Sequence, residues 1–388
     1  MNFEVVIVGG GPAGIAVAIE CARRGIDTAV FERRGAPLDK ACGEGLMPSG
    51  VVALERLGVI AHLGRDDCAP FDRIAWIQED GRGVEAALPS PGGLGVRRTS
   101  LVRAMRDVAR RAGVALFDAC ASRGCRIDRS GATLDTDAGE VRAHLVVAAD
   151  GLHSPLRRAA GLEREDHGPR RYGLRRHATV APWSRSVEVH FADGVEAYVT
   201  PSGAERVGVA FLWEHGRVDA VTFDALLARF PSLLARLADA RWESTARGAG
   251  PLRQSVHSRV SERLVLIGDA AGYVDAITGE GLSLAFDSAA ALGEILPDAL
   301  SHGATAASLA PYEIASEKAF RRYAALASLV LSATRRPRLR RALFEGLIAW
   351  PRSFEYAVSI AMGAHSKRRV EPLGLRSRPK GSPATDSE

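Results

Sequence analysis

The stretch FEVVIVGGGPAG, residues 3–14, decides the fold. Its first half, residues 3–8, is a short apolar run that stops at a glycine, as expected for a buried parallel strand. Apolar residues with helical spacing follow over 13–24 and end at Gly25, and residues 28–31 (TAVF) form the next apolar run. This strand–helix–strand order predicts a βαβ unit and an α/β fold.

The turn between the first strand and the helix has the pattern Gly-x-Gly-x-x-Gly, in the context that gives this pattern meaning. Gly9 is predicted to permit a tight turn, Gly11 to let the backbone approach a pyrophosphate, and Gly14 to allow close packing of helix on strand. Pro12 and Ala13 begin the helix, whose unpaired N–H groups attract phosphate. The turn therefore predicts a dinucleotide site.

An acidic residue, Glu32, closes the second strand, 18 residues after Gly14. A carboxylate there can bind the ribose hydroxyls of an adenine nucleotide, and it would repel a 2′-phosphate. We include its neighbour Arg33 among the residues expected to contact the cofactor.

Two later segments also place an acidic residue and a glycine directly after an apolar run. Asp150 and Gly151 follow LVVAA, and Asp269 follows Gly268 after LVLI. Ligands of parallel α/β sheets bind at the carboxyl ends of the strands, so both segments are candidates for the same site. Each alone is equally well explained as a turn in which aspartate caps a helix. Their combination with the glycine-rich turn favours one site built from three segments.

The remaining pattern predicts further elements. We expect a helix over 99–112 with Thr99 as a candidate N-cap, a hairpin-like region at 125–142, and a C-terminal part that is mostly helical. Alternating runs indicate antiparallel strands of a second sheet. The strands expected in this second sheet are 187–191, 197–200 and 207–212. Outside it we expect strands at 114–117, 145–149 and 263–267 and a helix over 281–296.

The composition is that of a soluble globular protein, with 46% apolar and 25% charged among 388 residues. The formal net charge of +5 is spread along the chain, so we expect no nucleic-acid partner. The five cysteines lack paired spacing and the histidines lack ligand spacing, so we expect neither a disulfide framework nor a metal site. No signal peptide or membrane-spanning run is evident, which indicates a cytoplasmic protein.

Four segments taken in order resemble one known family. They are GGGPAG with Glu32, then GVRRTSLVRAM (95–105), ADGLHSPLR (149–157) and GDAAGYVDAITGEGL (268–282). This order is similar to that of the flavoprotein monooxygenase superfamily of the para-hydroxybenzoate hydroxylase type, and closest to its geranylgeranyl-reductase-like branch. The resemblance implies a Rossmann-like FAD-binding domain of the glutathione-reductase type, with an inserted antiparallel β-sheet substrate domain and C-terminal helices.

The resemblance also implies roles for single residues. Arg98, in the pattern Arg-x-x-Leu, would contact the phosphate or ribityl region of FAD. Asp150 and Gly151 would lie near the pyrophosphate, and Asp269 would hydrogen-bond the ribityl chain. A helix start would present N–H groups to the isoalloxazine ring, where a helix N-terminus stabilises negative charge. The residues of that helix start are Gly279, Glu280, Gly281 and Leu282.

The segment 40–48, KACGEGLMP, resembles the CGEG segment of the same branch and is expected to pass close to the flavin ring. Gly43 and Cys42 are therefore included among the cofactor contacts. Cys42 is open to three interpretations: a proton donor, a substrate contact, or a buried small residue.

Two segments, 172–177 (YGLRRH) and 197–201 (AYVTP), belong to the second sheet. Tyr198 lies where the reductases carry a tyrosine-tryptophan-phenylalanine-proline type strand, but no tryptophan precedes the Thr-Pro pair here. For Arg176 and His177 we weigh binding of an acidic or phenolic group against a solvated sheet face. We favour the solvated face because charged residues are mostly exposed.

The leading hypothesis is an FAD-dependent monooxygenase that acts on a small hydrophobic or aromatic intermediate, with NAD(P)H as the reductant. The histidine and proline that follow GDAA in the hydroxylases are absent, and Gly272 and Ala276 stand there. One alternative is a reductase for C=C bonds of a lipophilic chain, with Cys42 as proton donor. Another is a flavin-bound assembly or binding protein. A halogenase Trp-x-Trp-x-Ile-Pro element, a second Gly-x-Gly-x-x-Gly and a hydrolase Gly-x-Ser-x-Gly elbow are absent.

Arg335–Arg341 is basic and Ala342–Trp350 is apolar, which suits a peripheral membrane contact, a cover over a substrate tunnel, or a packed helix with a cationic face. We favour the packed helix.

The expected domain layout is discontinuous. The FAD-binding domain comprises 1–70, 96–170 and 252–300, and the substrate-binding sheet domain comprises 71–95 and 171–251. A helical region follows over 301–365, and the tail 366–388 is expected to be disordered.

Overall fold

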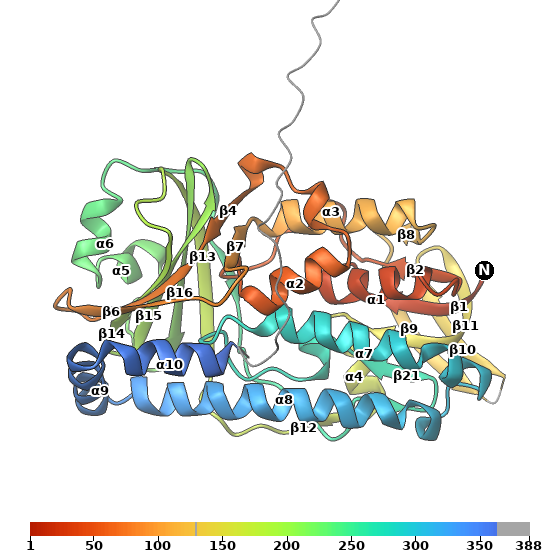
Figure 1. Cartoon of the computed structure of the whole chain (residues 1–388). Helices are drawn as coiled ribbons and strands as arrows, with labels where there is room; N and C mark the ends of the chain where they lie inside the picture. The colour runs from red at the N-terminus through yellow and green to blue at the C-terminus, as the bar shows by residue number, and fades with distance from the viewer. Residues whose placement is uncertain (129, 363–388) are drawn as a thin grey trace, which may run out of the picture.

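The computed structural model describes residues 1–128 and 130–362, so the expected tail lies outside the described residues. Figure 1 shows two large sheets, with helices packed on the first sheet and a long C-terminal helix that runs past both. The expected combination of a Rossmann-like sheet, a second sheet and C-terminal helices is confirmed. The domain boundaries stay a prediction.

The first sheet contains the strand that opens the sequence. Strand β1 (Asn2–Val8) lies between β11 and β2 and pairs in parallel with both. Its residues alternate between two cores, with Val5 and Ile7 in one and Val6 and Val8 in the other. A strand buried on both faces reads as a continuous apolar run, which is the pattern of residues 3–8. The strand order of this sheet is β20 (Val260–Ser261), β21 (Leu264–Leu266), β11 (Gly139–Ala148), β1, β2 (Thr28–Phe31), β8 (Ala115–Phe117). Outside this order, β10 (Gly131–Thr136) pairs with β11, and β9 (Ser122–Asp128) pairs with β10.

Helices cover one face of this sheet. Helix α1 (Pro12–Ala22) packs between α3 (Arg98–Arg111) and α7 (Gly281–Ser301), and its eight residues Gly14–Cys21 are all buried. Helix α2 (Pro48–Arg56) packs against α7. These contacts form the largest apolar core and hold the starts of α1 and α7 next to the sheet.

The second sheet is antiparallel along most of its path, with one parallel pair between β14 and β5. Strand β13 lies near one edge and pairs with β16 and with two short strands. Two short helices, α5 (Phe223–Leu227) and α6 (Pro231–Arg236), pack on one face. The order is β17 (Arg241–Trp242), β13 (Arg171–Thr179), β16 (Arg206–Glu214), β15 (Val195–Gly203), β14 (Ser186–Ala192), β5 (Arg73–Ile77), β6 (Gly83–Ala87), with β18 (Arg247–Ala249) beside β13.

The C-terminal helices close the other face of the second sheet. Helix α8 (Ala306–Thr334) places Tyr323 and Leu331 against sheet residues, and Phe344 of α9 (Pro337–Ala349) stacks edge-on with Phe191. Helix α10 (Pro351–Ala361) packs on β6, as the lower left of Figure 1 shows. Among the described residues, none of the helices is long and apolar enough to cross a membrane.

The basic segment forms the start of α9. Arg340 is buried and bonds to Glu79, whereas Arg336, Arg338 and Arg341 are exposed. This matches a packed helix with a cationic outer face, and a membrane contact stays a prediction.

Three expectations differ from the structure. Thr99 lies inside α3 rather than at its N-cap, which is Arg97, because a distant carboxylate binds the helix start instead. The expected hairpin over 125–142 is present as β9, β10 and the first part of β11, but the strand expected at 145–149 is not separate from it, because β11 continues unbroken from its pairing with β10 to its pairing with β1. Helices α5 and α6 lie in a region where the sequence predicted only sheet.

The remaining short strands are β3 (Gly45–Leu46), β4 (Cys68–Phe71), β7 (Gly93–Val96), β12 (Glu163–Arg164) and β19 (Ser255–Val256), and α4 spans Pro155–Ala159.

Candidate functional site

The three glycine- and aspartate-containing segments meet at the carboxyl ends of β1, β11 and β21. A Cβ atom added to Gly9, whose φ is +112°, would lie 2.3 Å from the carbonyl oxygen of Ala149. A Cβ atom added to Gly268 would lie 2.8 Å from the Cβ of Ala13. Both contacts require glycine, because a side chain would collide with the neighbouring segment. The structure therefore brings the three predicted segments to one place.

The start of α1 combines close packing on one side with open space on the other. A Cβ atom at Gly14 would lie 2.1 Å from the carbonyl oxygen of Gly9, so the helix touches the turn there. A Cβ atom at Gly11 would meet nothing within 4 Å. Gly11 is the N-cap, Pro12 is the first helical residue, and no side chain caps the helix. The first N–H groups of α1 thus remain available to an anion.

Glu32 stands at the end of β2 and closes the glycine-rich turn. One carboxylate oxygen accepts a hydrogen bond of 2.8 Å from the Gly10 amide, and the other accepts one of 2.9 Å from the Arg34 amide. Arg33 is exposed beside it. Because a carboxylate accepts up to about four hydrogen bonds, Glu32 retains acceptor capacity for a ligand.

Asp150 follows β11 and binds the start of α4. One carboxylate oxygen accepts from the Leu156 amide at 3.3 Å, while the other is buried with no partner among the described residues. Burial raises the pKa of Asp150 above its usual value. Gly151 has a φ of +87°, and its Cβ position lies 3.6 Å from Nζ of Lys40.

Asp269 follows β21 and forms an ion pair of 2.8 Å with Lys40. Burial acts to raise the pKa of Asp269, but Lys40 and then Arg98 lower it below the usual value. Lys40 therefore lies between the second and third segments, next to Gly151 and bonded to Asp269.

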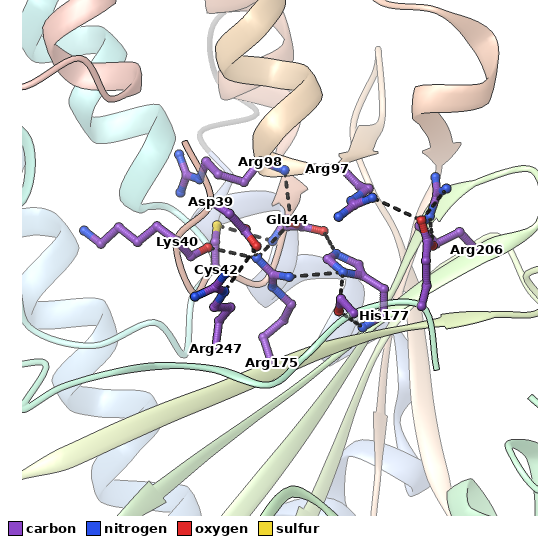
Figure 2. Close-up of polar contacts among 12 residues, drawn as sticks. Asp39, Lys40, Cys42, Glu44, Arg97, Arg98, Arg175, His177, Arg206 and Arg247 are labelled. Atoms are coloured by element: carbon purple, nitrogen blue, oxygen red, sulfur yellow. Dashed lines mark hydrogen bonds and ion pairs between the residues drawn. The ribbon is translucent and has the colours of Figure 1, made fainter. Parts of the chain in front are cut away.

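Figure 2 shows Cys42 and Arg98 close to Glu44. Burial disfavours the charged guanidinium of Arg98, but Cys42, Asp269 and Glu44 together raise its pKa above the usual value. The sulfur of Cys42 accepts a hydrogen bond of 3.4 Å from the Glu44 amide, and Gly43 has open space at its Cβ position.

The start of α7 and the neighbouring start of α2 carry buried oxygen atoms that lack partners within the described part of the chain. Gly279 adopts a φ of +69°, Glu280 is the N-cap, and Gly281 and Leu282 begin the helix. Burial, with a contribution from Asp287, raises the pKa of Glu280 to about 7. The unpartnered atoms are Ser49 Oγ, Thr278 Oγ1, one carboxylate oxygen of Glu280, and Ser283 Oγ.

Neighbouring residues of β13 point to opposite faces of the second sheet. Arg176 stacks on Phe223 and Trp242, with its guanidinium carbon 5.2 and 4.7 Å from the ring centroids, on the face covered by α5. His177 is completely buried on the other face, where its Nε2 lies 2.6 Å from Glu44. Neither residue lies on the solvated face that the sequence favoured, and only His177 approaches the predicted cofactor segments.

Tyr198 of β15 is buried in an apolar cluster between the second sheet, α8 and residues 273–277. Its hydroxyl has no partner among the described residues, and burial raises its pKa well above the usual value. Beside it, the Arg171 guanidinium forms ion pairs with Glu196 and, at 3.1 Å, with Asp275.

A family model described as an FAD binding domain matches residues 2–326. The chain belongs to this FAD-binding family. The assignment confirms the resemblance drawn from the sequence and makes FAD the cofactor.

Two curated relatives show what members of the FAD-binding family do. A menaquinone reductase of Mycobacterium tuberculosis is 30% identical over 323 residues, and the alignment covers 76% of each chain. A kynurenine 3-monooxygenase of Salinispora tropica is 30% identical over 368 residues, covering 80% of this chain and 76% of that one. A crystal structure of a flavoprotein/dehydrogenase from Cytophaga hutchinsonii has a TM-score of 0.81 at 17% identity and covers 94% of this chain and 93% of that chain. This member of the FAD-binding family is therefore an FAD-dependent oxidoreductase.

The site fits FAD on features of the structure itself. The open space before Gly11 suits a pyrophosphate, and the unpartnered oxygens near the start of α7 offer hydrogen bonds to a polar ring edge. The sequence did not single out Lys40, Glu44 or Arg175 individually. Lys40 and Glu44 stand in the segment 40–48, two residues on either side of Cys42, and Arg175 stands in the segment 172–177, from which the sequence selected only Arg176 and His177.

Proposed function

We propose that the enzyme reduces a carbon–carbon double bond of a lipophilic substrate, with electrons supplied by NAD(P)H. The observation that carries this proposal is the position of Cys42, in the segment whose Lys40 is bonded to Asp269 and whose Glu44 binds the Arg98 amide. When bound, FAD carries two electrons between the external reductant and the substrate. The sequence favoured oxygen transfer, and we now place reduction first because a thiol in this position suits a proton donor.

We propose that FAD lies along the line of the three segments. The glycine-rich turn and the start of α1 would bind the pyrophosphate, and Glu32 would bind the ribose. The start of α7 would face the ring. The proposed contacts are Gly9, Gly11, Pro12, Ala13, Gly14, Glu32, Arg33, Cys42, Gly43, Arg98, Asp150, Gly151, Asp269, Gly279, Gly281 and Leu282.

The substrate would bind in the apolar cluster that contains Tyr198. This cluster joins the second sheet to α8 and to the segment after β21, and the segment leads directly to the start of α7. A buried hydroxyl without a partner costs about 1–3 kcal/mol, so we propose that Tyr198 binds a substrate oxygen. The substrate would then be mainly apolar with at least one carbonyl or hydroxyl group.

Reduction of a double bond also needs a proton for the second carbon. We propose the Cys42 thiol as the donor. Glu280 is the alternative donor, because its pKa of about 7 keeps the carboxyl partly protonated at neutral pH.

Monooxygenation is the second candidate. It is favoured by the 30% identity to a kynurenine 3-monooxygenase over 80% of this chain. Gly272 and Ala276 occupy the positions of the histidine and proline that hydroxylases of this superfamily carry, which is why we place oxygenation second.

The two candidates differ in what they add to the substrate. We would incubate the FAD-loaded enzyme with NAD(P)H and a polyprenyl lipid that carries no quinone ring, with and without oxygen, and analyse the product by mass spectrometry. Gain of two hydrogen atoms without oxygen, lost on Cys42→Ala, supports reduction. Gain of one oxygen atom that depends strictly on oxygen would overturn it in favour of oxygenation. Tyr198→Phe tests the substrate contact through KM.

A further inference from the structure

Glu44 is held in a strained backbone conformation by groups from two parts of the fold. Its φ is +60°, a left-handed conformation that a residue with a side chain adopts only when its surroundings enforce it. Its carboxylate is buried: one oxygen accepts a 2.9 Å hydrogen bond from the Arg98 amide, and the other lies 2.6 Å from Nε2 of His177. The Arg175 guanidinium lies 3.6 Å from the same carboxylate.

The neighbours of His177 identify which ring nitrogen carries the proton. The Arg175 guanidinium lies 3.0 Å from Nδ1, and a guanidinium only donates hydrogen bonds, so Nδ1 accepts. The Ser244 hydroxyl, 3.1 Å from Nδ1, can donate as well. Nε2 then carries the hydrogen and donates it to Glu44. The Nε2 hydrogen and the Nδ1 lone pair thus face two different partners, Glu44 and Arg175.

The same strand also binds the other end of the segment. Arg175 donates to Asp39 at 2.5 Å and to the Lys40 carbonyl at 3.1 Å. Figure 2 shows Arg175 and His177 rising from β13 toward residues 39–44, with Arg98 on the far side of Glu44. The charged groups around His177 are Asp39, Glu44, Arg98, Arg175 and Arg247, and, beyond Ser244, Glu243 with Arg97 and Arg206.

We infer that His177 is a positioning residue for the cofactor site. Its imidazole joins Arg175 to Glu44, and so holds residues 39–44 against the start of α3. Those residues carry Lys40, which is bonded to Asp269, and Cys42, which interacts with Arg98. The second sheet thereby sets the position of the residues that face FAD. This inference rests on the proposed binding of FAD along this segment.

Three substitutions separate the two hydrogen bonds of the ring. His177→Gln retains a donor near the Nε2 position, His177→Asn retains an acceptor near Nδ1, and His177→Leu removes both. His190→Gln is the matched control, because His190 is also a buried histidine of this sheet bonded to a carboxylate, that of Glu188 at 2.9 Å. The measurements are the dissociation constant of FAD for each variant and the ¹⁵N spectrum of the histidine rings in the protein with and without FAD.

We expect FAD to bind about tenfold more weakly to the Asn variant, the effect of losing one hydrogen bond to a charged group, and at least as weakly to the Leu variant, which loses both bonds of the ring. The Gln variant and the His190→Gln control should stay within about threefold of the wild type. The spectrum should show His177 with its hydrogen on Nε2. If the Leu variant does not fold, the comparison of Asn with Gln decides.

An Nδ1-protonated or doubly protonated His177, or an Asn variant that binds FAD as tightly as the wild type, would overturn the inference. Failure of the wild type itself to bind FAD would instead overturn the proposed cofactor site. The ring spectrum can still be read in that case, so the two failures are distinguishable.

Discussion

The Nζ atom of Lys40 lies 2.8 Å from a carboxylate oxygen of Asp269, although the two residues are 229 positions apart in the chain. Lys40 belongs to the segment that contains Cys42, and Asp269 ends the third strand of the cofactor site. The ion pair therefore joins two segments that the sequence predicted separately to face the same cofactor.

Lys40→Met should lower the free energy of unfolding of the FAD-free protein by at most about 1 kcal/mol, because the Lys40 side chain is 45% exposed. Lys40 lowers the pKa of Asp269 below 3.8, so its contribution is present above that value and is lost as pH falls through the lowered pKa. Urea unfolding across this range measures the difference, and Lys40→Arg is the control that keeps the charge. A difference between wild type and Lys40→Met that persists at the lowest pH would contradict the assignment.

Gly11 and Gly14 should respond differently to alanine. Gly14→Ala places a methyl group 2.1 Å from the Gly9 carbonyl, so we expect a loss of stability of about 1–3 kcal/mol. Gly11→Ala meets no atom within 4 Å and should change stability by less than about 0.5 kcal/mol. It should nevertheless weaken FAD binding at least about tenfold, because the methyl group occupies the space of the pyrophosphate. Thermal unfolding and FAD titration of both variants check this, and tight FAD binding by Gly11→Ala would place the pyrophosphate elsewhere.

Glu280 should make the FAD-free protein less stable as pH rises. Its pKa is raised from 4.5 to about 7, so the folded state disfavours the charged form, and stability falls as pH rises from 4.5 through about 7. Glu280→Gln removes this effect and should be more stable than the wild type by up to about 3 kcal/mol above neutral pH, with no advantage below 4.5. Unfolding curves of both proteins at several pH values test this. Equal pH dependence would show that Glu280 titrates normally.

The parts of the fold that the sequence predicted depend on local contacts. Strand β1, the glycine-rich turn, α1 and β2 follow one another directly, and Gly9 and Gly14 are each explained by a neighbour within the unit or at the adjacent strand end. Glu32 follows from the same unit, because it ends the strand next to β1. The meeting of Asp150 and Asp269 with this turn follows from the rule that parallel strands share one carboxyl edge.

The contacts of residues 39–44 were beyond prediction, because they depend on how distant segments approach one another. Arg175 contacts Asp39 across 136 positions, and His177 contacts Glu44 across 133 positions. Arginine and histidine are usually exposed in strands, so the pattern RRH favoured a solvated face. The segment 39–44 covers Arg175 and His177 on one face of β13, and Phe223 of α5 with Trp242 covers Arg176 on the other. Thr99 was wrong as an N-cap for a similar reason, since Glu44 arrives from another part of the chain to bind the helix start.

The FAD content of the purified, folded protein tests the central claim most directly. The three converging segments predict stoichiometric, non-covalent FAD, seen as a yellow protein with absorbance near about 450 nm, and its loss from Gly11→Ala without loss of fold. A folded wild-type protein that is colourless and does not bind added FAD would contradict the account.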